Sequence, residues 1–193
     1  MKVLREVGIT VLIAVVVFVV LQLNIQSYTV QGASMMPNVE EGEYIMVNKA
    51  RYRCSAPQRG DIIVFNPPFD SPRPYIKRVI GLPGEIVEIR DQQVFIDGEP
   101  LEELPSIPPP DYEMPSKEVP SDEYFVLGDN RNSSRDSSTG WTVPRENIIG
   151  KAWFAYWPPG QWGIVGHHSY PDLAGVEGEG ESDGMALPDW CTA

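Results

Sequence analysis

The stretch VQGASMMPNVEEGEYIMV, residues 30–47, places a serine among small residues and a Met-Met-Pro sequence, and then returns to the alternation of a strand. Gly32 and Pro37 favour a turn, and residues 44–47 alternate as a half-buried β-strand does. Patterning alone gives Ser34 no structural purpose in this position. The stretch therefore predicts β structure on its C-terminal side and makes Ser34 a candidate functional residue.

An uncharged apolar run, VGITVLIAVVVFVVLQL, precedes this stretch at residues 7–23. As a helix it would span roughly 25 Å, close to a hydrocarbon core of about 30 Å. A cleaved signal peptide is the alternative, but the run is long for an h-region of about 7–15 residues and no small-x-small site follows promptly. We therefore expect an uncleaved transmembrane anchor. Lys2 and Arg5 precede it and the next positive charge is Lys49, so residues 1–6 should be cytoplasmic and residues 27–193 extracytoplasmic.

Charge and cysteine content narrow the possible partners. The formal net charge of −12 disfavours nucleic acid, and it also disfavours broad electrostatic attachment to anionic lipid. Cys54 and Cys191 could pair in an oxidising compartment, but they lie far apart in sequence, so two unpaired thiols are favoured. No Cys/His cluster has the spacing of a metal site, and we expect neither a metal nor another cofactor.

Short strand-like runs make up most of the chain after the apolar segment. They are β-branched or aromatic and are bounded by Gly, Pro, Asn and Asp: SYTVQG, YIMV, DIIVF, YIKRVI, IVEIR, QVFIDG, YFVLG and AWFAYW. The sequence RDQQVFIDGEP is a hairpin candidate with Asp97 and Gly98 in its turn. The pattern predicts a mainly β fold, with a single N-terminal transmembrane helix followed by an all-β, barrel- or sandwich-like domain over residues 27–166.

Two segments depart from this strand pattern. Residues 99–120 hold seven prolines and several acidic residues. Because proline removes donors from a β ladder, we expect a surface excursion there instead of sheet. Residues 167–193 are Gly-rich and acidic with little periodic apolar content, and this composition predicts a disordered tail.

A nucleophilic Ser34 would need a base to take its proton. The two histidines, at 167–168, lie in the expected tail, so a Ser-His-Asp triad is not expected. Lys77 differs from the other four lysines because it lies inside a strand-like run, on the face of Tyr75 and Val79. Burial there would lower the pKa of Lys77, and a neutral amine can accept the serine proton. From the pattern alone, a solvated Lys77 on a half-exposed strand remains the simpler alternative.

Four motifs in order carry a resemblance to a known family: GASMMP (32–37), RGDIIVFNPP (59–68), YIKRVIGLPGE (75–85) and LGDNRNSSRDS (127–137). After one N-terminal anchor, they resemble type I signal peptidases, the membrane-bound Ser–Lys proteases that remove signal peptides. The resemblance covers residues 5–160. It implies an endopeptidase that cuts exported preproteins after a small-x-small, Ala-x-Ala-like site. The implied partners are signal peptides and the lipid bilayer, in the plasma (inner) membrane or the thylakoid membrane.

The resemblance also implies roles for individual residues. Ser34 matches the nucleophile and Lys77 the general base. Ser134 would hydrogen-bond the Lys77 amine and aim it at Ser34, and Asp136 would hold that loop by a polar contact. The backbone N–H of Ser34 would be one donor to the oxyanion. Some family members add a serine hydroxyl at the position of Gly32, so the second donor here would be a backbone N–H or water.

Further positions would support the site or bind substrate. Arg78 would pair with Asp129 and position strands more than add stability. The arginine that the family places near Asp136 is missing, which leaves Arg135 or Arg78 to replace it. The expected substrate-binding residues are Tyr28, Val30, Met35, Val39, Tyr75 and Ile76. The first two lie on the strand that leads to the nucleophile and would pair with an extended substrate by strand addition.

Two other functions stay open at this level. One is a related Ser–Lys protease that matures a single secreted protein or cleaves itself. The other is a membrane-tethered β domain that captures signal-peptide ends without cutting them. A pure binder has no need of an activated nucleophile, so replacing Ser34 with alanine distinguishes a binder from an enzyme.

Overall fold

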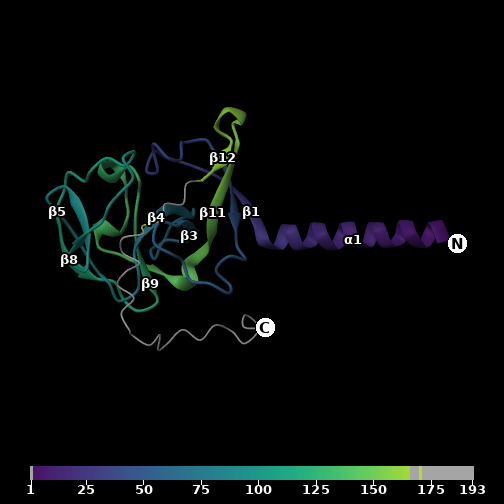
Figure 1. The fold of residues 1–193 in the computed structure, drawn as a ribbon, viewed down its shortest axis with the longest axis horizontal. Helices are drawn as coiled ribbons and strands as arrows, with labels where there is room; N and C mark the ends of the chain where they lie inside the picture. The colour runs from purple at the N-terminus through teal and green to yellow at the C-terminus, as the bar shows by residue number, and fades with distance from the viewer. Residues whose placement is uncertain (1, 166–169, 171–193) are drawn as a thin grey trace.

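A long helix and a β domain make up the part of the chain that this computed structural model describes, residues 2–165 and residue 170. Helix α1 (Lys2–Asn24) projects away from the β domain (Figure 1). Its Arg5–Asn24 portion has a mean hydropathy of 2.6, and the rest of the described chain buries none of it. By length and composition α1 can cross a membrane.

The larger sheet has eight strands and carries the cleft described below. Its order is β1-β2-β11-β3-β4-β9-β10, and β12 pairs with β11. The strands are β1 (Ile25–Thr29), β2 (Tyr44–Asn48), β3 (Ile62–Phe65), β4 (Tyr75–Gly81), β9 (Glu123–Leu127), β10 (Val143–Pro144), β11 (Ile148–Trp157) and β12 (Gly163–Ile164). Neighbouring strands run antiparallel, as expected for short strands joined by tight turns.

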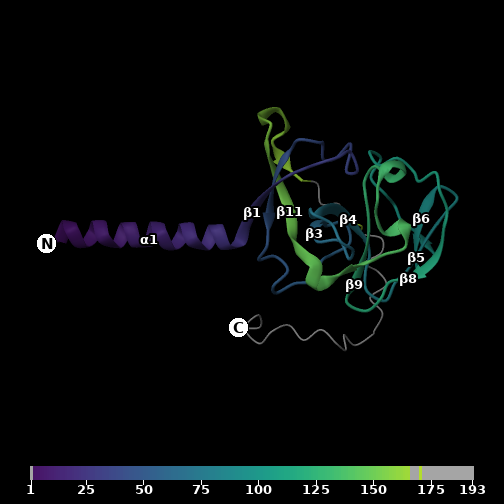
Figure 2. The ribbon, with the colours of Figure 1, turned by 180° about the vertical axis from the view of Figure 1, so that it is seen from behind.

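A smaller four-stranded sheet lies at the end of the domain away from α1 (Figure 2). Its order is β7-β6-β5-β8, with bounds β5 (Ile86–Arg90), β6 (Gln93–Ile96), β7 (Glu99–Pro100) and β8 (Met114–Glu118). Asp97 and Gly98 join β6 to β7 with φ values of 52° and 87°. Positive φ at both residues is typical of a tight hairpin turn, so the predicted hairpin is confirmed.

Strand β4 lies between β3 and β9 and contacts all three hydrophobic clusters of the core. Ile80 packs in the cluster under the smaller sheet, Val79 in the cluster around Phe65 and Tyr124, and Ile76 against the cluster on the cleft side. Residues 77–81 are all buried. A charged side chain in this segment is therefore held away from water on both faces of the sheet.

All eight strand-like runs of the sequence contain a strand, but residues 99–120 differ from the prediction. β7 and β8 lie within this segment, which was expected to be an excursion without sheet. The expectation was wrong because both are edge strands, where a proline such as Pro115 loses no ladder hydrogen bond. The segment is also anchored by apolar side chains that are buried in the core: Leu101, Ile107, Met114 and Val119.

The helical segments of the described chain beyond α1 are all short 3₁₀ turns: η1 (Arg131–Ser133), η2 (Ser137–Thr139), η3 (Arg145–Asn147) and η4 (Pro159–Gln161).

Cys54 is disulfide-bonded, which corrects the expectation of two unpaired thiols; Cys191 lies outside the described residues. The predicted tail, 167–193, also lies outside them apart from Tyr170. Tyr170 is buried in the cluster under the smaller sheet, so the expectation of disorder is wrong at this residue, whose aromatic ring has a core to pack into.

Candidate active site

An open cleft of about 630 Å³ lies between the loop after β1 and the start of β4. Residues 27–34 form one wall and residues 73–77 the other, and the remaining lining residues are Ile45, Val64, Ser133 and Arg135. Within residues 2–165, no three His, Cys, Asp or Glu side chains are grouped to hold a metal ion. The side chains that line this cleft include hydroxyl, amine and guanidinium groups.

Ser34 and Lys77 meet in this cleft, one from each wall. Lys77 Nζ lies 2.6 Å from Ser34 Oγ and donates a second hydrogen bond to the Ile76 carbonyl at 2.9 Å. The same Nζ is 5.7 Å from the centre of the Tyr75 ring, which places both side chains on one face of β4 as the alternation predicts. Only 3% of Lys77 is exposed, so the alternative of a solvated lysine is wrong.

Burial changes the acidity of the Lys77 amine. Loss of hydration lowers its pKa from 10.5 to about 8, while the negative charges of Asp136 and Asp129 oppose this shift. Neither carboxylate hydrogen-bonds the amine among the described residues. A substantial share of Lys77 is therefore neutral just above neutral pH, and a neutral amine can take a proton from the adjacent hydroxyl.

The loop after β9 holds the segment that carries Ser34. Asn130 donates its backbone N–H to the Ser34 carbonyl at 3.0 Å and its side-chain amide to the Ala33 carbonyl at 3.1 Å. Gly128 approaches so closely that a Cβ there would overlap the Ser34 carbonyl oxygen and Ser134 Oγ. Asn130 lies in the motif LGDNRNSSRDS, and nothing in that pattern pointed to these contacts.

Ser134 lies near the pair but does not make the predicted contact. Its Oγ is buried and has no hydrogen-bond partner among the described residues, so it does not bond the Lys77 amine. The amine instead donates to Ser34 and to the Ile76 carbonyl. The motif thus correctly predicted that Ser134 lies close to the Ser34 segment. The orientation of its hydroxyl depends on packing against Gly128.

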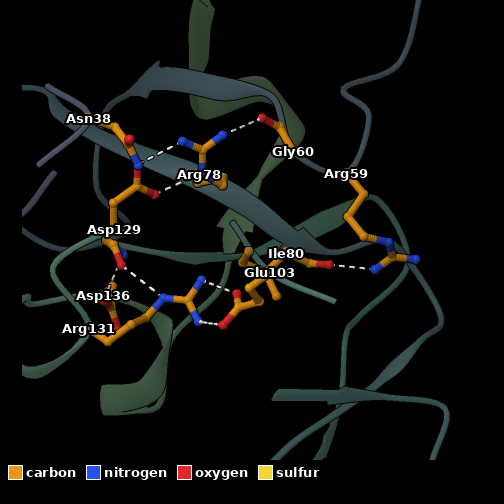
Figure 3. A network of polar contacts seen from close by, with 10 residues as sticks. Asn38, Arg59, Gly60, Arg78, Ile80, Glu103, Asp129, Arg131 and Asp136 are labelled. Atoms are coloured by element: carbon orange, nitrogen blue, oxygen red, sulfur yellow. Dashed lines mark hydrogen bonds and ion pairs between the residues drawn. The ribbon is translucent and has the colours of Figure 1, made fainter. Parts of the chain in front are cut away.

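Arg78 points to the opposite face of β4 and pairs with Asp129 (Figure 3). Two hydrogen bonds, at 2.8 and 2.7 Å, join the guanidinium to the carboxylate, and a third reaches the Gly60 carbonyl at 3.0 Å. Asn38 donates to the same carboxylate at 2.9 Å. Burial lowers the pKa of Arg78, but the hydrogen bonds and charge of Asp129 outweigh it and raise the pKa. The structure thus forms the Arg78–Asp129 pair that the family resemblance implied.

Asp136 holds the neighbouring loop through N–H and hydroxyl donors. Its carboxylate accepts from Gly128 N–H at 2.9 Å, Ser138 N–H at 3.2 Å and Ser138 Oγ at 2.8 Å. These donors take the place of the arginine that the motif lacks. Arg135 instead lies with its guanidinium 4.4 Å from the centre of the Phe69 ring.

A second ion pair, between buried Arg131 and half-buried Glu103, joins the proline-rich segment to the same loop. The guanidinium of Arg131 donates to both oxygens of Glu103, one at 2.6 Å, and to the Gly128 carbonyl at 3.1 Å (Figure 3). Asn132 adds a hydrogen bond to the Pro109 carbonyl at 3.1 Å. Sequence reasoning missed Glu103, because a single acidic residue in a proline-rich run gives no sign of its partner.

The predicted substrate-binding residues divide into two groups. Tyr28, Val30, Tyr75 and Ile76 line the cleft as expected. Met35 and Val39 do not line it; they are 1% and 0% exposed in the core cluster behind it. The correction has a simple cause, since apolar side chains beside an exposed turn gain more by entering the core than by lining an open cleft.

Comparisons with known proteins agree on one family. The family model for signal peptidases, peptidase S26, matches residues 3–157. The chain is 43% identical over 144 residues to a probable signal peptidase I-1 of Synechocystis sp., covering 71% of this chain and 74% of that protein. It is 43% identical over 160 residues to a signal peptidase I of Leptolyngbya laminosa, covering 77% and 79%.

More distant relatives carry related names. Thylakoidal processing peptidase 1 of Arabidopsis thaliana is 36% identical over 141 residues, which are 68% of this chain and 42% of that protein. A crystal structure of a signal peptidase I from Enterococcus faecalis V583 matches with a TM-score of 0.44 and 35% identity, over 50% of this chain and 97% of that one. Because the family model spans most of the chain and the first two relatives share this extent of identity, the chain belongs to the signal peptidase family, peptidase S26, and is an enzyme of the signal peptidase I type.

Proposed function

We propose that the chain is a membrane-anchored serine endopeptidase that removes N-terminal signal peptides from exported preproteins, with Ser34 as nucleophile and Lys77 as general base. One observation carries the proposal: the buried Lys77 amine lies 2.6 Å from Ser34 Oγ in an open cleft. This distance is within the reach a general base needs. The lowered pKa of Lys77, about 8, adds the neutral form that the role requires.

The reaction proceeds in two proton-coupled steps. Neutral Lys77 takes the proton of Ser34 Oγ, which attacks the carbonyl carbon of the scissile bond. As the C–N bond breaks, Lys77 returns the proton to the leaving amine and an acyl-enzyme remains. Lys77, neutral again, then takes a proton from water, which attacks the ester. As the ester C–O bond breaks, Lys77 returns this proton to Ser34 Oγ and the free enzyme is restored. The Ser34 backbone N–H is the proposed donor to the oxyanion.

Substrate selection follows from the walls of the cleft. Tyr28 and Val30 line it from the strand and loop that lead to Ser34, and Tyr75 and Ile76 line it from β4. An extended substrate would add as a strand between these two segments. The large side chains leave space for small residues beside the dyad, so we propose cleavage after a small-x-small, Ala-x-Ala-like site.

The proposed anchor is α1, with the N-terminus in the cytoplasm and the β domain on the far side of the membrane. The basic residues Lys2 and Arg5 support this orientation. The cyanobacterial and thylakoidal relatives favour a plasma or thylakoid membrane. Protease protection in sealed vesicles tests the orientation: a protease added on the extracytoplasmic side should digest the β domain, and one confined to the cytoplasmic side should leave it intact.

The enzymatic proposal is tested by cleavage of a purified preprotein in detergent. Wild type should cut once, after a small-x-small site, and Ser34→Ala and Lys77→Ala should both fail to cut. Lys117→Ala is the matched control, because Lys117 lies outside the cleft and should not affect cutting. Cutting by Lys77→Ala would show that the base is another group. Wild type that binds the preprotein without cutting it would overturn the proposal in favour of a tethered binder.

A further inference from the structure

The cleft differs in charge from the rest of the chain. The chain carries a formal net charge of −12, yet three residues that line the cleft are basic and none is acidic. Lys77 is neutral when it acts as the base, so Arg73 and Arg135 hold the remaining charge. Neither arginine pairs with a carboxylate among the described residues. The cleft therefore presents two positive charges that the fold leaves without an acidic partner.

An aromatic platform fixes the position of Arg135. Its guanidinium lies 4.4 Å from the centre of the Phe69 ring, a cation–π geometry. Phe69 in turn packs edge-on against Tyr75 and Trp141, with ring centres 5.9 and 5.6 Å apart. Tyr75 belongs to the wall of the cleft, so this stack ties the Arg135 guanidinium to that wall. A positioned guanidinium loses less side-chain entropy when it binds a carboxylate than a freely moving one does.

Arg73 connects the two walls of the cleft. It precedes Lys77 by four residues on one wall, and its guanidinium donates to the side-chain oxygen of Gln31, which precedes Ser34 by three residues on the other. The hydrogen bond to a neutral amide leaves the positive charge of Arg73 in place. Arg73 and Gln31 therefore lie on the walls between which a substrate of a few residues would bind.

We propose that Arg73 and Arg135 make the enzyme selective for preproteins with an acidic side chain in the segment that lies across the cleft. This inference rests on the proposed function, because only a substrate of the Ser34–Lys77 dyad occupies the cleft in that way. Both guanidiniums are exposed, so each interaction with a substrate carboxylate is screened by salt. Exposed ion pairs contribute about 0.2–1 kcal/mol, which corresponds to about a 1.5- to fivefold effect on kcat/KM for each arginine.

The test uses one preprotein and a scan of single substitutions. The scan covers the four positions before and the four positions after the cleaved bond, except for the two small residues of the site. Asp, Asn and Lys are placed in turn at each of these positions. Wild type should cut at least one Asp substrate about two- to fivefold faster, in kcat/KM, than its Asn counterpart, and cut the Lys counterpart more slowly. Raising the salt concentration should reduce this preference.

Variants of the enzyme then assign the preference to the two arginines. Arg135→Gln and Arg73→Gln should each reduce the ratio of kcat/KM for an Asp substrate to kcat/KM for the Asn substrate with the change at the same position. Arg135→Glu should invert the preference at the position that Arg135 faces, so that Lys is cut faster than Asp there. The matched control is Arg90→Gln, because Arg90 also stacks on a phenylalanine, Phe95 at 3.7 Å, but lies outside the cleft.

The outcomes separate this inference from the proposed function. If wild type cuts the Asn substrates and Ser34→Ala does not, the proposed function stands whatever the charge series shows. The inference is overturned if no position distinguishes Asp from Lys, or if the preference is the same in wild type, Arg73→Gln and Arg135→Gln. A preference that Arg90→Gln alters as strongly would also overturn it, since the effect would then come from overall charge.

Discussion

The two faces of β4 bury two neighbouring basic side chains, and the pKa is lowered on one face and raised on the other. On the cleft face, Lys77 hydrogen-bonds a hydroxyl and a carbonyl, and burial lowers its pKa to about 8. On the other face, Arg78 pairs with Asp129 through two hydrogen bonds, and its pKa is raised. Both side chains are at most 3% exposed. The carboxylate partner of Arg78 accounts for the opposite directions of the two pKa shifts, and Arg78 keeps its proton also because a guanidinium is the stronger base.

The different partners of Lys77 and Arg78 indicate different roles for these adjacent residues, in the reaction for Lys77 and in the fold for Arg78. A buried charge with a matched counterion can hold segments together, whereas a buried amine without one is pushed toward its neutral form. The neutral form is the one that can accept a proton from Ser34. We therefore expect substitutions on the cleft face to affect turnover, and substitutions on the other face to affect folding.

The largest expected effect is that of Lys77→Met. Removing a general base typically lowers turnover by about 10²–10⁴-fold, so we expect kcat to fall by about 10³-fold or more. The free energy of unfolding should change by about 1 kcal/mol or less at pH 7, because methionine fills a similar volume and removes a charge that burial disfavours. Preprotein cleavage and urea denaturation measure the two quantities. A loss of several kcal/mol in stability would erase the distinction between the two faces.

Arg78→Met should show the opposite behaviour. It leaves the Asp129 carboxylate buried without its counterion, which typically costs about 3–5 kcal/mol. The midpoint of urea denaturation should fall accordingly, and any loss of activity should follow the loss of folded protein. The double variant Arg78→Met/Asp129→Leu tests the cause, because it removes both charges and should recover part of the stability. A double variant no more stable than Arg78→Met would contradict this account.

The pH dependence of activity and of stability tests the lowered pKa of Lys77. Below a pKa of about 8, kcat/KM should rise about tenfold per pH unit as Lys77 loses its proton, and then level off. Stability should respond with a defined sign, because the unfolded chain binds more protons than the folded one between about 8 and 10.5. The free energy of unfolding therefore gains a contribution from Lys77 as pH rises through this window and loses it as pH falls. The difference between wild type and Lys77→Met isolates this term, and a pH-independent difference would count against it.

Asn130→Ala should have the smallest effect of the four. The change removes the side-chain hydrogen bond to the Ala33 carbonyl and keeps the backbone bond to Ser34. A typical hydrogen bond contributes about 0.5–1.5 kcal/mol, so we expect kcat to fall by about two- to tenfold with KM unchanged. Asn132→Ala is the matched control, because Asn132 reaches Pro109 on the proline-rich segment instead of the Ser34 loop. A rise in KM, or an equal drop in kcat for Asn132→Ala, would assign Asn130 a different role.

Local patterns predicted the parts of the fold that local interactions decide. The alternation around Lys77 placed it on the face of Tyr75, and Asp97-Gly98 predicted its own hairpin, because both depend on a few neighbouring residues. β10 and β12 have two residues each and are too short to leave a pattern. β8 was missed because Pro115 usually argues against a strand, and only its edge position makes it acceptable.

The site shows the same division. The motifs brought Ser34, Lys77, Arg78 and Asp129 together as expected. The contacts of Asn130 with the Ser34 loop and of Glu103 with Arg131 join segments far apart in sequence, and no periodicity records such a pairing. The expected bond from Ser134 to Lys77 is absent for a related reason, since the direction of one hydroxyl depends on close packing that a sequence pattern does not encode.

The junction between α1 and β1 has a consequence for how the enzyme measures its substrates. β1 begins at Ile25, directly after the last helical residue, and the Asn24 carbonyl accepts a hydrogen bond from Lys49 N–H at 2.8 Å. If α1 spans the membrane as proposed, this junction without a linker fixes the distance between the cleft and the lipid surface. It would then also fix the distance between that surface and the bond that is cut. Inserting flexible residues between Asn24 and Ile25 should then widen the range of spacings between the apolar segment of a substrate and the bond that is cut. An unchanged range of spacings would show that the distance is set elsewhere.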